Sequence, residues 1–500
     1  MVGPRLQVSS PAGRWVLGAT VLGSSMALLD STVVNVALPT IGRHLNASLA
    51  ELQWVINGYT LSLAGLILLG GSLGDRVGRR RVFLIGVVWF ALASALCGAA
   101  PSITVLIGAR VLQGVGGALL TPGSLAIIQA SFAHDERARA VGAWSGLGGV
   151  AAAIGPVLGG WLVQAAGWRW VFLLNLPLAA AVVVVTMRHV PETRDPASHG
   201  GFDIAGAGLA ALALAGIAYA LIGATGSAGT TKVIVAAVIG VAAAAGFVEV
   251  ERWRTRQPEP TPPMLPLDVF SSRQFTVINV ITFLVYAAFG GVLFLLVLQL
   301  QVGAGFSPVA AGSALLPVTL LMLGLSARAG SFAQRHGPRW LMTGGLIGLA
   351  AGMALMTRIG VHASYVADVL PAVVVYGLGL CVTVAPLTAT VLASADVRHA
   401  GVASGVNNAV ARVAGLLAVA ALPAAVGLTS AAYHQPALFS RGFDHAVIAC
   451  ALLLLVAAAL TAALVDNNVL RSCVPPEAST ICTITAPQLQ PVPHRAASGR

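Results

Sequence analysis

The chain has 500 residues, of which 57% are hydrophobic and 9% are charged, and its formal net charge is +11. Soluble domains carry roughly 25% charged residues, so this composition excludes a soluble protein and indicates a chain embedded in a lipid bilayer. The arginines lie between apolar segments, and we therefore interpret the positive charge as an orientation signal rather than a nucleic-acid surface.

Long apolar segments recur along the whole chain, separated by short polar breaks. A helix of about 20 residues crosses the ~30 Å hydrocarbon layer of a bilayer. The sequence therefore predicts an all-α integral membrane protein with 14 spans. Their approximate ranges are 15–38, 51–72, 82–100, 103–132, 138–163, 170–187, 204–224, 232–250, 274–298, 308–329, 341–358, 365–390, 400–428 and 443–465.

Basic residues are distributed unequally between the two sides of this arrangement. With the N-terminus in the cytoplasm, 21 arginines fall in inner loops and tails, and two, Arg110 and Arg412, fall inside spans. Cytoplasmic loops of membrane proteins carry an excess of Lys and Arg, so we expect a multi-pass protein of the plasma (inner) membrane with both termini cytoplasmic. The outer side holds five basic residues, namely Arg43, Arg169, Lys232, Arg358 and Arg441.

Two segments about half the chain apart share one pattern. Residues 71–80 and 330–339 carry the same glycines and arginines at four positions, 259 residues apart. Related halves around a central site are typical of transporters that rock one half against the other. We expect an N-terminal six-helix bundle at 1–190, two additional transmembrane helices at 191–250, a Pro-rich cytoplasmic linker at 251–273, a C-terminal six-helix bundle at 274–466 and a disordered cytoplasmic tail at 467–500.

Asp30 and Arg110 are the first candidate functional pair. At 1.5 Å per residue, Asp30 lies ~12 Å below the outer end of its span and Arg110 ~13 Å below the same surface. A charge at this depth costs at least ~2.5 kcal/mol, and intramembrane ionisable groups usually have a function. The pair is therefore a candidate proton relay, and the alternative is a fixed ion pair that only holds two helices together.

Two glycine-rich clusters form further candidate sites. In the loop after the second span, glycines permit tight turns, Asp75 can cap a neighbouring helix, and arginines can meet carboxylates or lipid phosphates; the alternative is an orientation signal alone. In the fifth span a proline bends the helix and small residues let helices approach closely, which simple packing also explains. The clusters comprise Gly71, Gly74, Asp75, Arg76, Gly78, Arg79 and Arg80 in the loop, and Gly155, Pro156, Gly159 and Gly160 in the span.

Polar and aromatic side chains inside spans are candidates for a substrate cavity. An arginine in the middle of a span needs a partner or a cavity, which applies to Arg412. Trp54 and Tyr59 are equally well interpreted as anchors at the membrane interface. The candidate cavity residues are Trp54, Asn57, Tyr59, Gln113, Gln299, Asn407, Asn408 and Arg412.

Five segments carry a family resemblance. Residues 71–80 resemble the loop signature of the major facilitator superfamily, and residues 29–39 resemble the first-helix motif of its fourteen-helix drug:proton antiporters, the EmrB/QacA-like branch. Residues 110–114 resemble the fourth-helix motif, residues 155–160 the fifth-helix antiporter motif, and residues 168–177 are similar to that branch. The resemblance implies a major facilitator fold, with two six-helix bundles and two extra central helices.

The resemblance also implies roles for the candidate residues. Asp30 and Arg110 correspond to groups that couple protons to transport, the loop cluster to a conformational latch between the halves, and the cluster in the fifth span to an element that seals the path. The second copy of the loop has Gln334 in place of Asp75, so its latch is expected to be weaker or absent.

The expected function is proton-coupled efflux of lipophilic drugs or antibiotics by alternating access. We expect a monomer that interacts with lipophilic small molecules, protons and the bilayer, with no nucleic acid, no metal, no cofactor beyond the proton gradient and no enzymatic activity. Because Asp30 is the only carboxylate deep in the spans, neutral or monocationic substrates are expected. The alternatives are an exporter of a single endogenous metabolite, lipid or siderophore, and a membrane scaffold that does not transport.

Overall fold

The computed structural model describes residues 6–133, 136–194, 203–224, 229–257, 263, 265, 267–394, 400–433 and 435–470. Within these ranges every named element is a helix, and one isolated β-bridge joins Leu6 to Phe132. Fourteen helices of the described part are long and apolar enough to cross a membrane. This confirms the predicted all-α fold and its number of spans. The centre of the expected Pro-rich linker and the tail beyond Leu470 lie outside the described residues.

The first half of the chain forms one bundle. Serine side chains cap several of its helices: Ser10 accepts the N–H of Gly13, and Ser48 and Glu51 form a reciprocal capping box, which satisfies backbone donors that have no partner inside the helix. The helices are α1 (Pro11–Leu45), α2 (Leu49–Val77), α3 (Arg79–Ala99), α4 (Ile103–Ser131), α5 (Arg137–Ala165), α6 (Arg169–Leu173) and α7 (Asn175–His189).

The second half forms a similar bundle. Several of its spans are composites, in which a short or irregular helical turn continues into the main helix. The elements are η1 (Leu267–Ser271), α10 (Arg273–Leu298), η2 (Gln299–Gly303), α11 (Pro308–Ser313), α12 (Leu316–His336), α13 (Pro338–Leu355), η3 (Met356–Arg358), η4 (Tyr365–Val369), α14 (Leu370–Ala393), α15 (Ala400–Ala425), α16 (Ser430–Tyr433) and α17 (Pro436–Leu464).

Two additional helices, α8 (Ile204–Gly223) and α9 (Thr230–Arg256), form a hairpin between the bundles. Asp203 caps α8 by accepting the N–H of Gly206 and forms an ion pair with Arg254 near the end of α9. These contacts tie the two ends of the hairpin together. Helix α9 ends at Arg256, so its last turns lie within the region 251–273 that was expected to be the linker.

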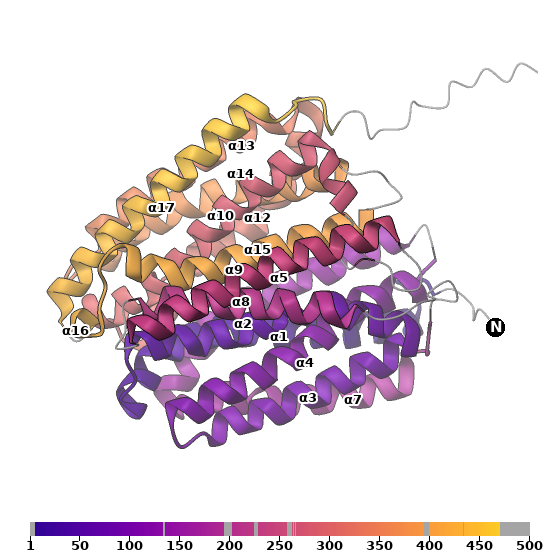
Figure 1. Ribbon diagram of the computed structural model, residues 1–500, viewed down its shortest axis with the longest axis horizontal. Helices are drawn as coiled ribbons and strands as arrows, with labels where there is room; N and C mark the ends of the chain where they lie inside the picture. Colours follow the sequence, from indigo (N-terminus) through magenta and orange to yellow (C-terminus); the bar gives the residue numbers. More distant parts are fainter. Residues whose placement is uncertain are drawn as a thin grey trace, which may run out of the picture.

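The hairpin lies along one boundary between the bundles (Figure 1). Helix α8 packs against both α2 and α15, and buried residues of α8 and α15 form one apolar cluster comprising Ala218, Ile222, Leu416 and Ala420. Trp54 of α2 adds a ring contact with Tyr219 of α8, with centroids 6.2 Å apart. The boundary between α2 and α15 is thus covered by α8.

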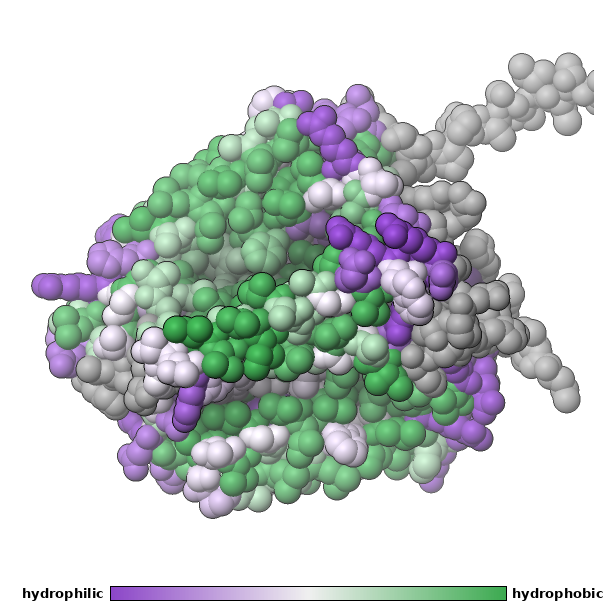
Figure 2. Space-filling model, in the orientation of Figure 1, coloured by the Kyte–Doolittle hydropathy of each residue, from purple (hydrophilic) through white to green (hydrophobic). Residues whose placement is uncertain are grey.

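The outer surface agrees with a membrane protein. Figure 2 shows hydrophobic side chains over the middle of the visible face and hydrophilic side chains gathered at its two ends. One end bears the start of α3, with Arg79, Arg80 and Arg81, and the start of α13. We refer to it as the arginine-rich end.

Candidate functional site

Asp30 of α1 lies at the centre of a buried polar network. Its Oδ2 accepts a hydrogen bond from Nη1 of Arg110 on α4 at 2.5 Å. Its Oδ1 accepts from Nε2 of Gln113 at 2.8 Å and from Nδ2 of Asn175 at 3.2 Å. Asp30 is 1% exposed and Arg110 0%, so water does not reach the pair in this conformation. The two charges lie at the same depth, as their positions in the sequence predicted.

Ser94 holds two of these side chains in place. Ser94 of α3 accepts hydrogen bonds from Gln113 at 3.1 Å and from Asn175 at 3.0 Å, and it donates to the carbonyl of Phe172 at 2.9 Å. Helices α1, α3, α4 and α7, together with Phe172 of α6, therefore meet around one carboxylate. Buried polar groups of this kind are stable only when they are hydrogen-bonded.

Arg110 is held as tightly as Asp30. Its Nε donates to the carbonyl of Val55 at 3.1 Å and its Nη1 to Oε1 of Gln113 at 2.6 Å. The guanidinium lies over the ring of Tyr59, 4.3 Å from the centroid, a favourable arrangement for a cation and a π face. The Nη2 atom has no hydrogen-bond partner among the described residues. Gln113, a predicted cavity residue, therefore belongs to the Asp30 network.

The small residues of α5 bring this helix into close contact with α1 and α11. A methyl group at Gly155 would overlap Thr32 Oγ1, and one at Gly159 would approach Val33 Cγ1 to 2.8 Å. On the opposite side, a methyl group at Gly160 would overlap the carbonyl of Pro308. Only glycine permits these approaches, and two of them lie within three residues of Asp30 in α1.

The loop cluster has contacts within the first half. Asp75 forms an ion pair with Arg79, one turn later, at 2.7 Å. The carboxylate at the N-terminus of α3 is that of Glu192, which follows α7 and accepts the backbone N–H of Arg80 at 3.1 Å. The sequence suggests Asp75 as a cap for a neighbouring helix, whereas in the structure Glu192 is the carboxylate at the start of α3. Gly78 has φ of +131°, a backbone conformation that other residues rarely adopt.

The second copy of the loop repeats this geometry without the charge. Gly337 has φ of +92°, and the backbone N–H of Arg339 donates to Oδ1 of Asn467 at 3.2 Å. Arg80 and Arg339 are equivalent in the 259-residue repeat, so Asn467 replaces Glu192. The sequence repeat is thus a structural repeat, and its first copy alone has a carboxylate in this position.

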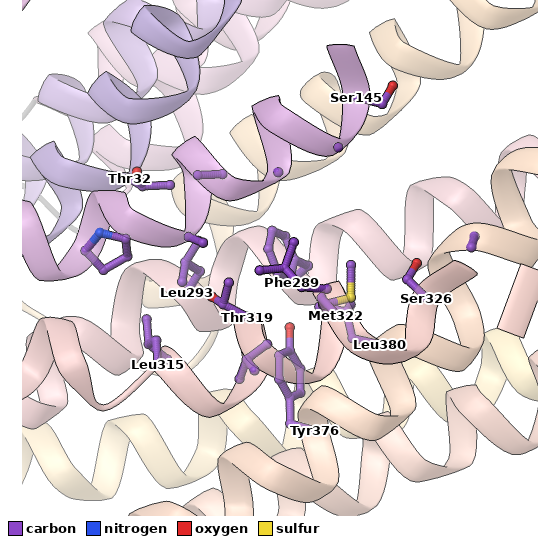
Figure 3. Close-up of a pocket in the computed structure, with 18 of the residues that line it drawn as sticks. Thr32, Ser145, Phe289, Leu293, Leu315, Thr319, Met322, Ser326, Tyr376 and Leu380 are labelled. Atoms are coloured by element: carbon purple, nitrogen blue, oxygen red, sulfur yellow. The ribbon is translucent and has the colours of Figure 1, made fainter. Parts of the chain in front are cut away.

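A cavity of about 650 Å³ lies between the two bundles. It is lined by residues of α1, α5, α10, α12 and α14, together with Leu315 before α12. None of the lining side chains is charged, and the hydroxyl of Tyr376 points into it beside Phe289, Thr319 and Met322 (Figure 3). The other lining hydroxyls belong to Thr32, Ser145, Thr319 and Ser326. Such a surface suits a bulky apolar molecule with a few polar groups.

The predicted cavity residues do not line this cavity. Trp54 packs against α8, Asn57 and Tyr59 are buried, and Gln299 donates to the carbonyl of Ile359 and to Ser440 within the second half. The three remaining predicted cavity residues lie on α15. Asn407 donates to Asn279 and Thr282 of α10, Asn408 is exposed, and Arg412 is partly buried.

The two halves are in contact away from the arginine-rich end. Gln53 near the start of α2 donates to the carbonyl of Val419 at 2.6 Å, and Gln301 donates to the carbonyl of Val36 at 2.9 Å. The cavity extends between α5 and α12 toward the arginine-rich end, where its lining includes Ser145 and Gly330. The structure is therefore closed across one end of the bundles.

Together, the two related bundles and the cavity between them define a polytopic membrane transporter. The family model of the Major Facilitator Superfamily matches residues 20–419. The chain therefore belongs to the major facilitator superfamily, and its 14 spans agree with the fourteen-helix branch of drug exporters. It is a transporter and not an enzyme.

Similar proteins include several drug-resistance exporters. The puromycin resistance protein pur8 of Streptomyces alboniger is 36% identical over 92% of this chain and 93% of its own length. The tetracenomycin C resistance and export protein of Streptomyces glaucescens is 35% identical over 81% of this chain and 74% of its own. The multidrug efflux pump LfrA of Mycolicibacterium smegmatis is 33% identical over 83% of this chain and 81% of its own length.

Solved structures share the fold at low sequence identity. A mutant of the peptide transporter POT superposes with a TM-score of 0.65 at 15% identity, covering 93% of this chain and 98% of its own. An inward-facing bacterial homologue of the lysosomal transporter Spinster superposes with a TM-score of 0.60 at 18% identity, covering 91% and 97%. These likenesses concern the fold alone.

Proposed function

We propose that this chain exports lipophilic drugs or antibiotics across the plasma membrane in exchange for protons. The observation that carries the proposal is the Asp30–Arg110 pair, a buried carboxylate with a buried counter-ion, adjacent in α1 to the cavity residue Thr32. The names of the relatives, which include resistance and export proteins, support the substrate class. We propose that Asp30 and Arg110 couple protons to transport in this chain.

Protonation of Asp30 would remove the counter-ion of Arg110. Breaking a buried ion pair in this way costs about 3–5 kcal/mol, an amount large enough to bias two conformations of the transporter against each other. In the structure the pair is intact and inaccessible to water. In this proposal, protons from the outer side reach Asp30 once the contacts made by Gln53 and Gln301 have separated.

With the arginine-rich end in the cytoplasm, the structure corresponds to an inward-open state. The cavity between α5 and α12 then receives substrate from the cell interior or the inner leaflet, and the contacts at the other end close the outer side. In this proposal the tight α1–α5 packing at Gly155 and Gly159 transmits a shift of Asp30 to the cavity wall, and the loop at Asp75 stabilises one of the two states.

The test uses cells that lack their own drug exporters and express the chain. Resistance to at least one lipophilic antibiotic in a panel is expected, and collapse of the proton gradient by a protonophore should raise accumulation of that compound to the level of empty cells. Unchanged susceptibility to every compound, or export that survives the protonophore with ATP held constant, would contradict the proposal.

A further inference from the structure

Arg412 is a second cation in the membrane interior, and it lies in the other half of the molecule. It follows the start of α15 by 12 residues, a rise of ~18 Å at 1.5 Å per residue, which places it near the middle of the helix. A guanidinium remains charged under all cellular conditions. A charge at this depth is costly unless it has a partner or contacts water in a cavity.

Arg412 differs from Arg110 in its surroundings. Among the described residues no hydrogen bond or ion pair involves its guanidinium, and its Nε is buried without a partner. Tyr59 of α2 and Tyr286 of α10 lie within electrostatic range of it, and none of the ion pairs among the described residues joins it to a carboxylate. The hydroxyl of Tyr59 is itself buried without a hydrogen-bond partner.

Asp30 does not neutralise Arg412. Its Oδ2 is bound by Arg110 and its Oδ1 by Gln113 and Asn175, so its lone pairs are directed at residues of the first half. The Asp30–Arg110 pair is neutral as a whole. The described membrane interior near Tyr59 therefore carries one positive charge in excess, on Arg412.

We propose that Arg412 forms a subsite for an anionic group, a carboxylate or an ionised phenol, on a lipophilic substrate. The inference rests on the proposed export function and specifies the substrate class. It differs from the expectation of neutral or monocationic substrates, in which a monocation would need Asp30 as its partner. The buried hydroxyl of Tyr59, which has no hydrogen-bond partner among the described residues, offers an O–H donor in the same region of the molecule. A guanidinium forms strong, charge-assisted hydrogen bonds with a carboxylate.

The proposed subsite has an exposed polar neighbour on α15 and an apolar neighbour on α10. Asn408, one turn before Arg412 on the same helix face, is exposed, and its amide donates to the carbonyl of Ser404 in its own helix. Tyr286 contacts Phe289 on α10, with ring centroids 6.3 Å apart, and Phe289 lines the large cavity. An anionic head at Arg412 and an apolar body near Phe289 fit one amphipathic molecule.

The test compares two probes of the same shape and different charge. Binding of 1-pyrenebutyrate and of its neutral primary amide to the purified full-length chain in nanodiscs is measured by fluorescence anisotropy. The wild type is expected to bind the carboxylate about tenfold more tightly than the amide, equivalent to about 1.4 kcal/mol. In Arg412→Gln the ratio should fall to within about twofold of one, with the affinity for the amide unchanged within the same factor.

Two controls separate charge from fold. Arg412→Lys keeps the charge and should retain a preference for the carboxylate of at least about threefold, and it also tests the inference should Arg412→Gln fail to fold. Arg441→Gln removes an exposed arginine at the other end of the second half and should behave as the wild type. A wild-type ratio near one, or an unchanged ratio in Arg412→Gln, would overturn the inference.

Chloride is the other anion that an unpaired arginine can hold. The preference for the carboxylate is expected to persist at about 0.15 M chloride, the physiological ionic strength, and its disappearance there would assign the site to chloride instead. The binding assay needs no proton gradient. Gradient-driven export of a neutral drug with no preference for the anionic probe would remove this inference and leave the proposed function intact. A preference for the anionic probe without any gradient-driven export would support the anion subsite and contradict the proposed function.

Discussion

Asp30 accepts hydrogen bonds from three side chains, two on α4 and one on α7. Arg110 supplies the opposite charge, whereas Gln113 and Asn175 supply neutral amides that also reach Ser94. The amides hold the carboxylate in position beside Arg110, and in the proposed cycle they remain its donors when the pair separates. At the scale of single residues, Asn175 is therefore a positioning residue for the proposed coupling pair.

Replacing Asn175 by leucine should test this role. The variant keeps the side-chain volume but removes the donors to Asp30 and Ser94, and a hydrogen bond to a charged group contributes about 1.5–3 kcal/mol. We expect about a tenfold lower rate of gradient-driven export, with substrate binding retained. Asn35→Leu is the matched control, because Asn35 donates to the carbonyl of Ser31 in its own helix; equal losses in both variants would contradict the role.

The depth of Asp30 and Arg110 could be predicted from the sequence, because a helix advances by a constant rise per residue. The contacts of Gln113 and Asn175 could not, since they depend on how four helices rotate about their axes. Asn175 lies within one of the family segments, at residues 168–177, and this was the only signal for it. Glu192 had no signal of its own, because its role depends on its distance from α3.

At the scale of helices, the small residues of α5 determine how closely it approaches α1. Gly155 faces Thr32, and Gly159 faces Val33. These contacts lie one turn of helix or less from Asp30. The spacing of the glycines predicted a close helix contact but not its partner, because small residues on one helix fit many neighbours equally well.

Gly155→Val should separate α1 from α5. The added methyl groups overlap Thr32 Oγ1, and overpacking of this kind typically costs 1–3 kcal/mol, so a lower melting temperature and at least about tenfold weaker export are expected. Gly142→Val is the control, because no atom lies within 4 Å of a methyl group placed there. Normal export by Gly155→Val would show that the α1–α5 contact is not required.

The two copies of the loop should differ in their sensitivity to substitution. Asp75 pairs with Arg79 in the first copy, whereas the second copy has Gln334 at the equivalent position. Asp75→Asn is expected to slow export several-fold, and Gln334→Glu to have little effect, since only the first copy has a carboxylate to lose. Rates of export from vesicles measure both. Equal effects would refute the assignment of the switch to the first half.

At the scale of the molecule, the two boundaries between the bundles are unequal. Helix α8 covers the boundary between α2 and α15 through Ala218 and Ile222, whereas the boundary between α5 and α12 contains the cavity. The sequence predicted the number of spans and the two related halves. It did not predict which helices line the cavity, because this depends on the arrangement of complete bundles.

The orientation of the molecule in the membrane is a prediction of the charge distribution. The excess of arginine in alternate loops predicts that both termini lie in the cytoplasm. Reporter fusions at residue 228, between α8 and α9, and at residue 260, after α9, should report outside and inside respectively. A cytoplasmic signal at both positions would contradict the topology and the assignment of an inward-open state.

The most direct test of the proposed coupling measures protons and substrate in the same proteoliposomes. Wild type, Asp30→Asn and the control Glu249→Gln, whose carboxylate is exposed on α9, are compared under an imposed pH gradient. Substrate-dependent proton flux is expected in the wild type and in Glu249→Gln and should be absent in Asp30→Asn, which still binds substrate. Proton flux per exported molecule that is unchanged in Asp30→Asn would show that coupling does not pass through this carboxylate.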